Sequence, residues 1–571
     1  MRNKLIIAVF AVIFSLTMLR SGWYLEDGYR LIGVNASDGV WNLALISELT
    51  NSFPPEHPGF AGVPLKGYHF YYHILLAGIS KITTIPAANL YFHIFPLIIS
   101  FFWGYGVYKV VVKLYKSKKA GLWSAFFSLF GGSFAFLLPL VWKQDLSINS
   151  GFGICQPLGC SLVNPAFASS IVLVIWSYYF LIEYLRTNKK KWAIWLIIFT
   201  GISVGFKVYA GMILMGALAV AAVWRAWSQR RFDLLAVFGL ALLIAMAVFF
   251  PFNANYGFLL FQPLWPPHIT MQGPLGFTRW RVLWELAEYT HNWWGIIKLE
   301  IWANGVFFLG NMGTRLLAIF ALGTFIKRGV LKVDTVFYLA MLGISYLIPM
   351  FFLQPAGGVF NMVQMYWYFL FLVSILVGPG IVSLMSKVNN RFYRILIYLL
   401  IVIITLPSSV TDLQILLTDK GRVIDNSQLE VLEFFREHGE YNQTVLQLPE
   451  LRQKYTKEEL YGWFTSRSST IIPALGGKRV YAVNEGVTFP DLDKEKRLAL
   501  IMQFLLPEVV CDEVNWDKLV CQDALDNSYE VLQAENIRFI YSKEARLWLD
   551  QWDKIETVFD GEGGKIYEFK S

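Results

Sequence analysis

The chain has few charged residues for its length. Of its 571 residues, only 16% are Asp, Glu, Lys or Arg, whereas 56% are hydrophobic and the mean hydropathy is +0.47. Ordinary soluble domains contain nearer a quarter charged residues. This deficit excludes an ordinary soluble protein and indicates an integral membrane protein.

Other features are also scarce. The segment after residue 410 contains no Gly-rich phosphate loop, no Ser-His-Asp spacing and no zinc-type cluster of Cys and His. The net charge of +8 is no evidence for nucleic-acid binding, because much of the excess lies in short connections between apolar segments. Lys and Arg gather in such connections on the cytoplasmic side of membrane proteins.

Apolar runs long enough to cross about 30 Å of hydrocarbon recur along residues 1–410. Hydropathy predicts about eleven transmembrane helices, with an upper limit of 13. The expected spans are Leu5 to Leu19, Leu90 to Leu114, Ala120 to Trp142, Phe167 to Leu185, Trp192 to Phe206, Tyr209 to Trp224, Leu234 to Phe250, Ile301 to Ile326, Thr335 to Phe352, Tyr366 to Met385 and Tyr393 to Val410. We therefore expect a polytopic α-helical membrane domain over 1–410.

Six basic clusters fall on one side of this arrangement, which we take as cytoplasmic. The first apolar segment lacks a cleavage site and is expected to remain as a span with a cytoplasmic N-terminus. The extracytoplasmic parts are then 21–89, 143–166, 251–300, 353–365 and 411–571. All four cysteines lie in these parts, so Cys155 with Cys160 and Cys511 with Cys521 are disulfide candidates.

Residues 192–224 are too long for one crossing and short for two. The charge alternation favours two spans with a break at GFKVYAG, from Gly205 to Gly211. This places Lys207 at or below the lipid headgroups. It is either a snorkelling lysine at a helix end or a cation that binds a lipid phosphate.

After residue 410 the charges become frequent and the apolar runs shorten. Strand-like runs start at Thr444, Arg479 and Ile537, and helix-like stretches cover Ser427 to His438 and Asp493 to Leu506. This alternation predicts a small extracytoplasmic α/β domain over 411–571.

The most informative segment is the first outer loop, from Ser37 to His73. Apolar residues from Val40 to Leu49 predict a helix along the membrane surface, with Ser37 or Asp38 as its cap. An Asp before a helix is often only a cap. Gly39, directly behind Asp38, allows a close approach of the backbone.

The patterns SDGVWNLALISEL and FPPEHPGFAGVPLKGYHFYYH resemble the first loop of the GT-C superfamily of membrane glycosyltransferases. The layout also resembles this family along nearly the whole chain: a short first span, a long outer loop with an early acid, about ten further spans and an outer C-terminal domain. One departure matters. Paired acids are common in the family, whereas Asp38 stands beside Gly39, and the acidic pair is Glu26 with Asp27.

The resemblance implies sugar transfer from a polyprenyl-phosphate donor to a lipid, glycan or protein acceptor on the outer face. The reaction needs a carboxylate base and cations that stabilise the departing phosphate. The catalytic candidates are Asp38 and, as its rival, Asp27 with Glu26. The phosphate-binding candidates are Lys207, Lys66, His69, Arg279 and Arg281, and the sugar or acceptor contacts are Tyr68, His268, Asn361 and Gln364.

Two open points concern these residues. Arg279 and Arg281 could instead be rim charges that face lipid headgroups. No cofactor is certain, and a divalent cation such as Mg²⁺ or Mn²⁺ is an option if the two acids and His69 supply ligands. The other expected partners are membrane lipids; the oligomeric state cannot be read from the sequence.

Two other function classes compete. A lipid or polysaccharide transporter, or flippase, would also be polytopic, but it should have inverted repeats and buried acids within its spans. No convincing repeat is found, and Glu183 is almost the sole acid inside a span. A non-catalytic envelope assembly protein would explain the outer domain but not the long acidic first loop.

Overall fold

The computed structural model describes residues 2–138, 151–253, 259–273, 277–354, 361–448, 470–483, 496–497, 499–501, 504 and 518–570. The chain forms two compact units. Unit 1, here called the helical unit, comprises Met1–Leu19, Gly67–Tyr72 and Ile94–Asp419. Unit 2, here called the mixed unit, comprises Arg20–Lys66, His73–His93 and Lys420–Ser571.

These compact units and the domains expected from the sequence differ over the first loop. The boundary at Asp419 lies close to the expected end of the membrane domain at 410, but most of the first loop joins the C-terminal segment. Two contacts explain why. Strand β2 (Gly28–Leu31) pairs antiparallel with β7 (Arg422–Ile424), and Phe60 from the first loop is buried in the same hydrophobic core as Ile540 and Tyr567.

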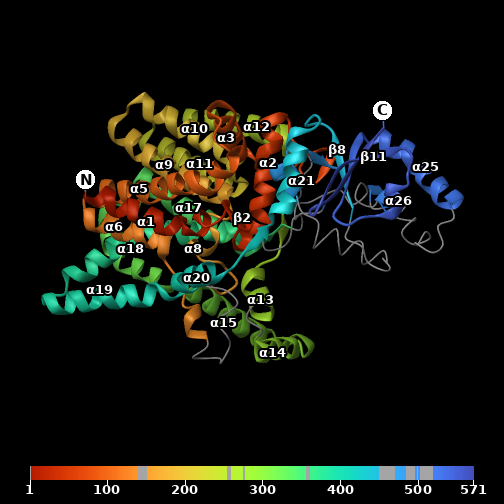
Figure 1. Ribbon diagram of the computed structural model, residues 1–571. Helices are drawn as coiled ribbons and strands as arrows, with labels where there is room; N and C mark the ends of the chain where they lie inside the picture. Colours follow the sequence, from red (N-terminus) through yellow and green to blue (C-terminus); the bar gives the residue numbers. More distant parts are fainter. Residues whose placement is uncertain are drawn as a thin grey trace. The chain divides into compact units, whose positions relative to one another are not determined.

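The helical unit consists mainly of long apolar helices, and Figure 1 shows α1, α5 and α9 side by side. Its helices are α1 (Arg2–Leu19), α5 (Phe95–Tyr115), α6 (Lys118–Phe130), α8 (Pro157–Cys160), α9 (Pro165–Thr187), α10 (Lys190–Phe206), α11 (Val208–Gln229), α12 (Asp233–Asn253), α13 (Trp265–Gln272), α14 (Thr278–Tyr289), α15 (Trp293–Met312), α16 (Leu322–Arg328), α17 (Val333–Phe351), α18 (Gln364–Ser386), α19 (Arg391–Thr405) and α20 (Pro407–Thr418). The 3₁₀ segments η3 (Ala135–Leu137) and η5 (Gly313–Ala321) and the short strands β5 (Leu260–Phe261) and β6 (Phe352–Leu353) complete it.

Within the described residues, eight helices are long and apolar enough to cross a membrane, or up to nine if the bent pair α19 and α20 is one span. The chain is a multi-pass membrane protein. The number is below the expected eleven because some expected spans form shorter helices. The expected span from Ala120 to Trp142 corresponds to α6, a helix of 13 residues that ends at Phe130, and α10 has only 17 residues.

The acid that the sequence places inside a span is paired. Glu183, near the end of α9, forms an ion pair with Lys113 at the end of α5. Arg225 of α11 likewise pairs with Asp233 at the start of α12, at 2.8 Å. These pairs tie neighbouring helices together, because a charge left unpaired in such a buried setting is costly.

The mixed unit combines first-loop and C-terminal elements. From the first loop come β1 (Trp23–Leu25), β2, η1 (Gly33–Ala36), α2 (Asp38–Asn51), β3 (Glu56–His57), β4 (Phe60–Pro64), α3 (Tyr71–Thr83, from His73 onward), α4 (Ala87–Asn89) and the π-helical η2 (Leu90–Ile94). From the C-terminal segment come β7, α21 (Asn426–Glu437), β8 (Thr444–Gln447), η7 (Ile472–Gly476), β9 (Arg479–Val480), α25 (Lys518–Ala534), β10 (Ile537–Ser542), α26 (Leu547–Asp550), β11 (Ile555–Gly561) and β12 (Gly564–Phe569).

The C-terminal strands form a five-stranded sheet in the order β11-β12-β10-β8-β9. Strand β8 is parallel to β10 and to β9, whereas β12 is antiparallel to β10 and β11. Helices α21 and α25 pack on strands of this sheet (Figure 1). The strand runs expected at Thr444, Arg479 and Ile537 and the helix expected from Ser427 are present; the helix expected over 493–506 lies largely outside the described residues.

Candidate functional site

Asp38 is the first residue of α2. Among the described residues its carboxylate accepts one hydrogen bond, from the Ser37 hydroxyl at 3.5 Å. Ser37 occupies the N-cap position of α2, one of the two positions expected, but its side chain makes no cap hydrogen bond. The Asp38 side chain is exposed, yet protein packed behind it raises the pKa of its carboxyl, and the hydrogen bond from Ser37 opposes this rise. An accessible carboxylate with raised proton affinity has the properties of a general base.

The helix that carries Asp38 is not a surface helix. Most of its residues are buried within the mixed unit, including the polar Asn42 and Glu48. The expectation that one face lies along a membrane surface missed this, because a mainly apolar run also fits a core helix whose two buried polar positions have partners.

Asn42 is one of these polar positions. Its Nδ2 donates to the carbonyl oxygen of Asp38 at 2.5 Å, and its Oδ1 lies 2.6 Å from Nε2 of His73, which donates to it. His73 is fully buried in α3. This chain of hydrogen bonds links the first turn of α2, and with it Asp38, to the next helix of the loop.

Glu48 is the other polar position, near the end of α2. Its carboxylate accepts hydrogen bonds from Arg479 at 2.8 Å, from Ser52 at 2.5 Å and from the Tyr441 hydroxyl. Arg479 also pairs with Glu56 at 2.9 Å. Burial acts to raise the pKa of Glu48, but these hydrogen bonds outweigh it, so its pKa lies below the usual value. We call Glu48, Glu56, Tyr441 and Arg479 the Arg479 cluster.

Sequence reasoning missed this cluster. A single acid inside the apolar run LALISEL was the available signal, because a buried carboxylate needs a cationic partner. The partner is 431 residues away along the chain, so the sequence does not identify it.

Glu26 and Asp27 form the turn between β1 and β2, and both are exposed. Asp27 is paired with Arg30 at 2.7 Å. The Asp27 carboxylate is thus already held by a cation, whereas no ion pair of Asp38 occurs in the described part of the chain. This favours Asp38 over its rival as a proton acceptor.

Lys207 lies at the break between α10 and α11, where its backbone is extended (φ −157°, ψ 122°). The predicted break is present. The side chain is only 5% exposed. Its Nζ donates to Nε2 of His69 at 3.1 Å and lies 5.8 Å from the centroid of the Tyr209 ring. In the described part of the chain, Lys207 forms no ion pair with Asp or Glu.

Beside Lys207, His69 stacks on an aromatic ring and lines a pocket. The Tyr68 ring stacks on its imidazole at 4.7 Å between centroids. Both side chains line a pocket of about 240 Å³ together with aromatic residues such as Tyr71, Phe249 and Phe252. The helical unit therefore places Tyr68, His69 and Lys207 together, while Lys66 is exposed and belongs to the mixed unit.

His268 lies in α13 against two tryptophans of α14. Its Nδ1 is 2.7 Å from the Glu300 carboxylate of α15, and Trp284 Nε1 donates to the same carboxylate at 2.9 Å. Glu300 was not anticipated from the sequence. Arg279 and Arg281 lie on α14 and are exposed, with Arg281 3.7 Å from Glu285.

Asn361, which precedes the start of α18, contacts Gln364, the first residue of that helix. Gln364 Nε2 donates to Asn361 Oδ1 at 3.2 Å, and Gln364 Oε1 accepts from Asn164 at 3.3 Å. Asn164 also caps α9 through the backbone N–H of Phe167. These amides therefore form a network that joins the starts of α9 and α18.

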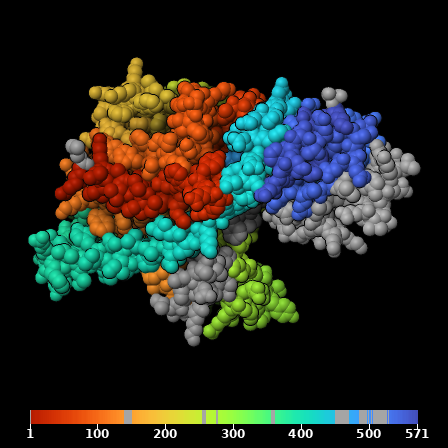
Figure 2. Space-filling model, viewed as in Figure 1, coloured from red at the N-terminus to blue at the C-terminus, as the bar shows by residue number. Residues whose placement is uncertain are grey.

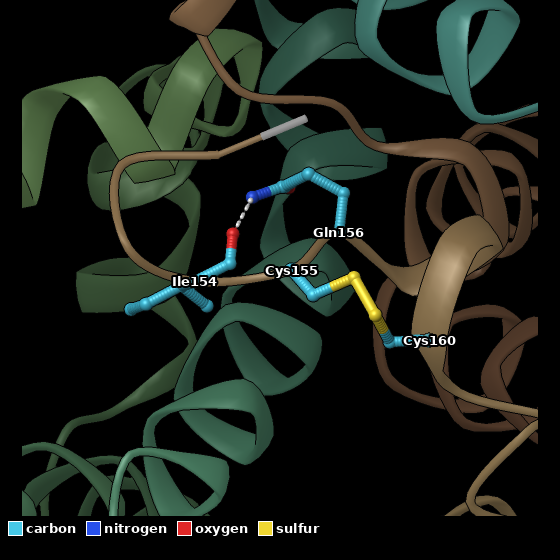
Figure 3. Close-up of a disulfide and its surroundings, with 4 residues drawn as sticks. All are labelled: Ile154, Cys155, Gln156 and Cys160. Atoms are coloured by element: carbon cyan, nitrogen blue, oxygen red, sulfur yellow. Dashed lines mark hydrogen bonds between the residues drawn. A yellow bond between two sulfur atoms is a disulfide. The ribbon is translucent and has the colours of Figure 1, made fainter. Parts of the chain in front are cut away.

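The structure contains a disulfide between Cys155 and Cys160 (Figure 3). Between them Gln156 donates through Nε2 to the carbonyl of Ile154 at 3.4 Å, and its Oε1 accepts from Arg315 at 3.1 Å. Arg315 is fully buried and also donates to the carbonyls of Gly131 and Gly132. Cys511, and the side chain of Cys521, lie outside the described residues.

No group of three or more His, Cys, Asp or Glu side chains that could hold a metal ion occurs in the described residues.

No protein-family model matches the sequence, and no curated protein matches it. Among solved structures, the chain is similar to the oligosaccharyltransferase of Archaeoglobus fulgidus tethered with an acceptor peptide containing the NVT sequon, with 12% identity, a TM-score of 0.47, and coverage of 95% of this chain and 69% of that one. The structure of the archaeal oligosaccharyltransferase AglB from the same organism, with an inhibitory peptide and a dolichol-phosphate, has 13% identity and a TM-score of 0.45. The match covers 95% of this chain and 69% of that one. The structure of the Archaeoglobus fulgidus oligosaccharyltransferase with Zn and sulfate has 12% identity and a TM-score of 0.47, and the match covers 94% of this chain and 68% of that one. The likeness is distant.

Proposed function

We propose that the chain is a membrane glycosyltransferase of the GT-C type, which moves a sugar from a polyprenyl-phosphate donor to a lipid, glycan or protein acceptor on the extracytoplasmic face. The observation that carries the proposal is Lys207, a buried cation at a break between two membrane helices. It has a histidine and an aromatic ring beside it, and no carboxylate partner in the described part of the chain.

Burial of an ammonium group without an anion costs free energy. Natural membrane proteins keep such charges mainly where they bind ions or substrates. A lipid phosphate would supply the missing negative charge at the expected depth of the headgroups. The His69 imidazole beside Lys207 offers a second nitrogen for the same phosphate.

Asp38 is the proposed base. It takes the proton of the acceptor hydroxyl, whose oxygen forms a bond to the anomeric carbon, while the bond from that carbon to the phosphate oxygen breaks and the phosphate leaves with the electron pair. Asp27 is the rival. The sugar contacts proposed from the sequence are Tyr68, His268, Asn361 and Gln364.

The topology belongs to the same proposal. The basic connections put the N-terminus in the cytoplasm and the C-terminal domain outside. A membrane-impermeant reagent added from the outside should therefore label residues 411–571, and this labelling is part of the test of function.

The experiment is a transfer assay with the full-length protein in liposomes and a labelled polyprenyl-phosphate sugar. We expect Asp38→Asn to lower turnover by roughly 10²–10⁴-fold, the usual contribution of a positioned base. Asp27→Asn serves as the matched control and should retain turnover. Loss of turnover in Asp27→Asn alone would move the base to Asp27, and unchanged turnover in folded Asp38→Asn protein would remove the assignment.

A second arm tests the phosphate site through binding alone. Polyprenyl phosphate is added to the protein in nanodiscs and retained lipid is measured by native mass spectrometry. Lys207→Met should weaken retention and Lys66→Met, at an exposed lysine, should not. Retention without any sugar transfer, combined with movement of the lipid between leaflets, would favour the flippase alternative.

A further inference from the structure

Helix α14 has three distinct faces. Trp280 and Ala287 are buried, with Trp284 between them, and the indole N–H of Trp280 donates to the carbonyl of Leu299 in α15 at 3.1 Å. A second face carries Arg281, Glu285 and Glu288. The third face is apolar and, unlike the first, is exposed among the residues that the structure describes.

This third face consists of Val282, Leu283, Leu286 and Tyr289, which are 52%, 43%, 56% and 85% exposed. Their spacing places them on one side of the helix. Figure 2 shows α14 at the lower edge of the view, in green. We call these four residues the outer stripe.

The exposure of the outer stripe is not explained by a helix that crosses the membrane. Exposed apolar side chains on long helices such as α12 are expected to meet the hydrocarbon chains of lipids. Helix α14 has 12 residues. At 1.5 Å per residue it is only about 18 Å long, against a hydrocarbon thickness of about 30 Å. It is also amphipathic rather than uniformly apolar, so its apolar side needs another explanation.

The next helix supplies one. Helix α15 begins with Trp293 and Trp294, which are 69% and 74% exposed, and the segment Trp293–Arg328 is apolar enough to span a membrane. Exposed Trp and Tyr residues are typical of the boundary between lipid and water. Tyr289 at the end of α14 and the two tryptophans therefore place the end of α14 at that boundary.

We propose that α14 lies in the plane of the membrane interface, with its outer stripe inserted between lipid headgroups and acyl chains. The partner is the lipid bilayer itself. The charged face then points to water, and Arg279, which is exposed on the apolar side, extends to the headgroup phosphates as a snorkelling side chain does.

The inference is independent of the proposed function. It assigns the exposed Arg279 to lipid headgroups rather than to the phosphate of a donor.

The test uses spin labels in the full-length protein in lipid nanodiscs. Single cysteines replace Val282, Leu286, Glu285 or Glu288 in a background with Cys511→Ser and Cys521→Ser, and the Cys155–Cys160 disulfide is kept. We expect the labels at 282 and 286 to be more accessible to oxygen than to a water-soluble nickel chelate, at a depth of about 5–10 Å. The labels at 285 and 288 should have the opposite preference.

Equal access of the nickel chelate at all four positions would overturn the proposal, because the stripe would then face water. Low access of both reagents at 282 and 286 would also overturn it, because another protein surface or a second copy of the chain would then cover the stripe. A second measurement guards against disruption by the label: hydrogen exchange in α14 should slow on transfer from detergent to nanodiscs in the unmodified protein and less so in Leu286→Asp.

Discussion

The surroundings of Lys207 and of Arg479 are two answers to the same physical problem, a cation removed from water. Arg479 in the mixed unit contacts two carboxylates and a tyrosine that shares one of them. Lys207 in the helical unit contacts a histidine and an aromatic ring. One cation is neutralised by the fold, and the other has no carboxylate partner among the described residues.

This difference in charge pairing indicates that one cation has a structural role and the other a binding role. A buried pair with full hydrogen bonding holds two segments in one arrangement, and its loss leaves an uncompensated charge. A buried cation without an anion adds nothing to folding and is tolerated where a ligand needs it. We therefore read the Arg479 cluster as the fixture that holds the Asp38 helix, and Lys207 as a binding group.

The largest expected effect is on stability, from Arg479→Ala. Glu48 then stays buried without a cation, which costs roughly 3–5 kcal/mol. Hydrogen exchange of α2 amides in the full-length protein should accelerate strongly. Arg479→Lys keeps a positive charge and should be milder. Slow exchange in Arg479→Ala would show that the cluster does not hold α2.

Lys207→Met should weaken lipid binding without lowering the stability of the protein. Loss of a charge-assisted hydrogen bond, about 1.5–3 kcal/mol, predicts roughly 10–150-fold weaker binding of polyprenyl phosphate. The melting temperature without lipid should stay the same or rise, because an unpaired buried charge is removed. A clear fall in melting temperature would mean that Lys207 is structural, as Arg479 is.

The pH dependence of the mixed unit should follow Glu48. Because its pKa is lower in the folded state, it contributes stability at neutral pH that is lost as the pH falls below the usual Glu value of about 4.3 toward the folded pKa. Hydrogen exchange of α2 should therefore rise between about pH 5 and pH 3, relative to its intrinsic rate. Glu48→Gln should flatten this dependence, and an unchanged profile would contradict it.

Tyr441→Phe should have the smallest effect. It removes one hydrogen bond to the Glu48 carboxylate and leaves those from Arg479 and Ser52, so a loss of about 1.5 kcal/mol, the low end for a hydrogen bond to a charged group, is expected. Chemical unfolding of the full-length protein, monitored by exchange in α2, measures it. A loss as large as that of Arg479→Ala would mean that the hydroxyl, not the ion pair, dominates.

The sequence predicted those parts of the site that depend on neighbours along the chain. The break at Lys207 follows from span length and charge alternation. The partner of Glu48 could not be predicted, because one acid in an apolar run indicates that a cation is near but not which one. The sequence predicted Ser37 or Asp38 at the start of α2, and Ser37 is the N-cap residue, but its side chain makes no cap hydrogen bond.

By itself the sequence determined that this is a multi-pass membrane protein, because hydrophobic composition and run length decide transfer into lipid locally. Only the tertiary structure decided that most of the first loop and the C-terminal segment form one unit, and that Lys207 meets His69 while Arg479 meets Glu48. Those contacts join residues more than a hundred positions apart. Burial and charge pairing at such separations depend on how the whole chain packs, which no local pattern records.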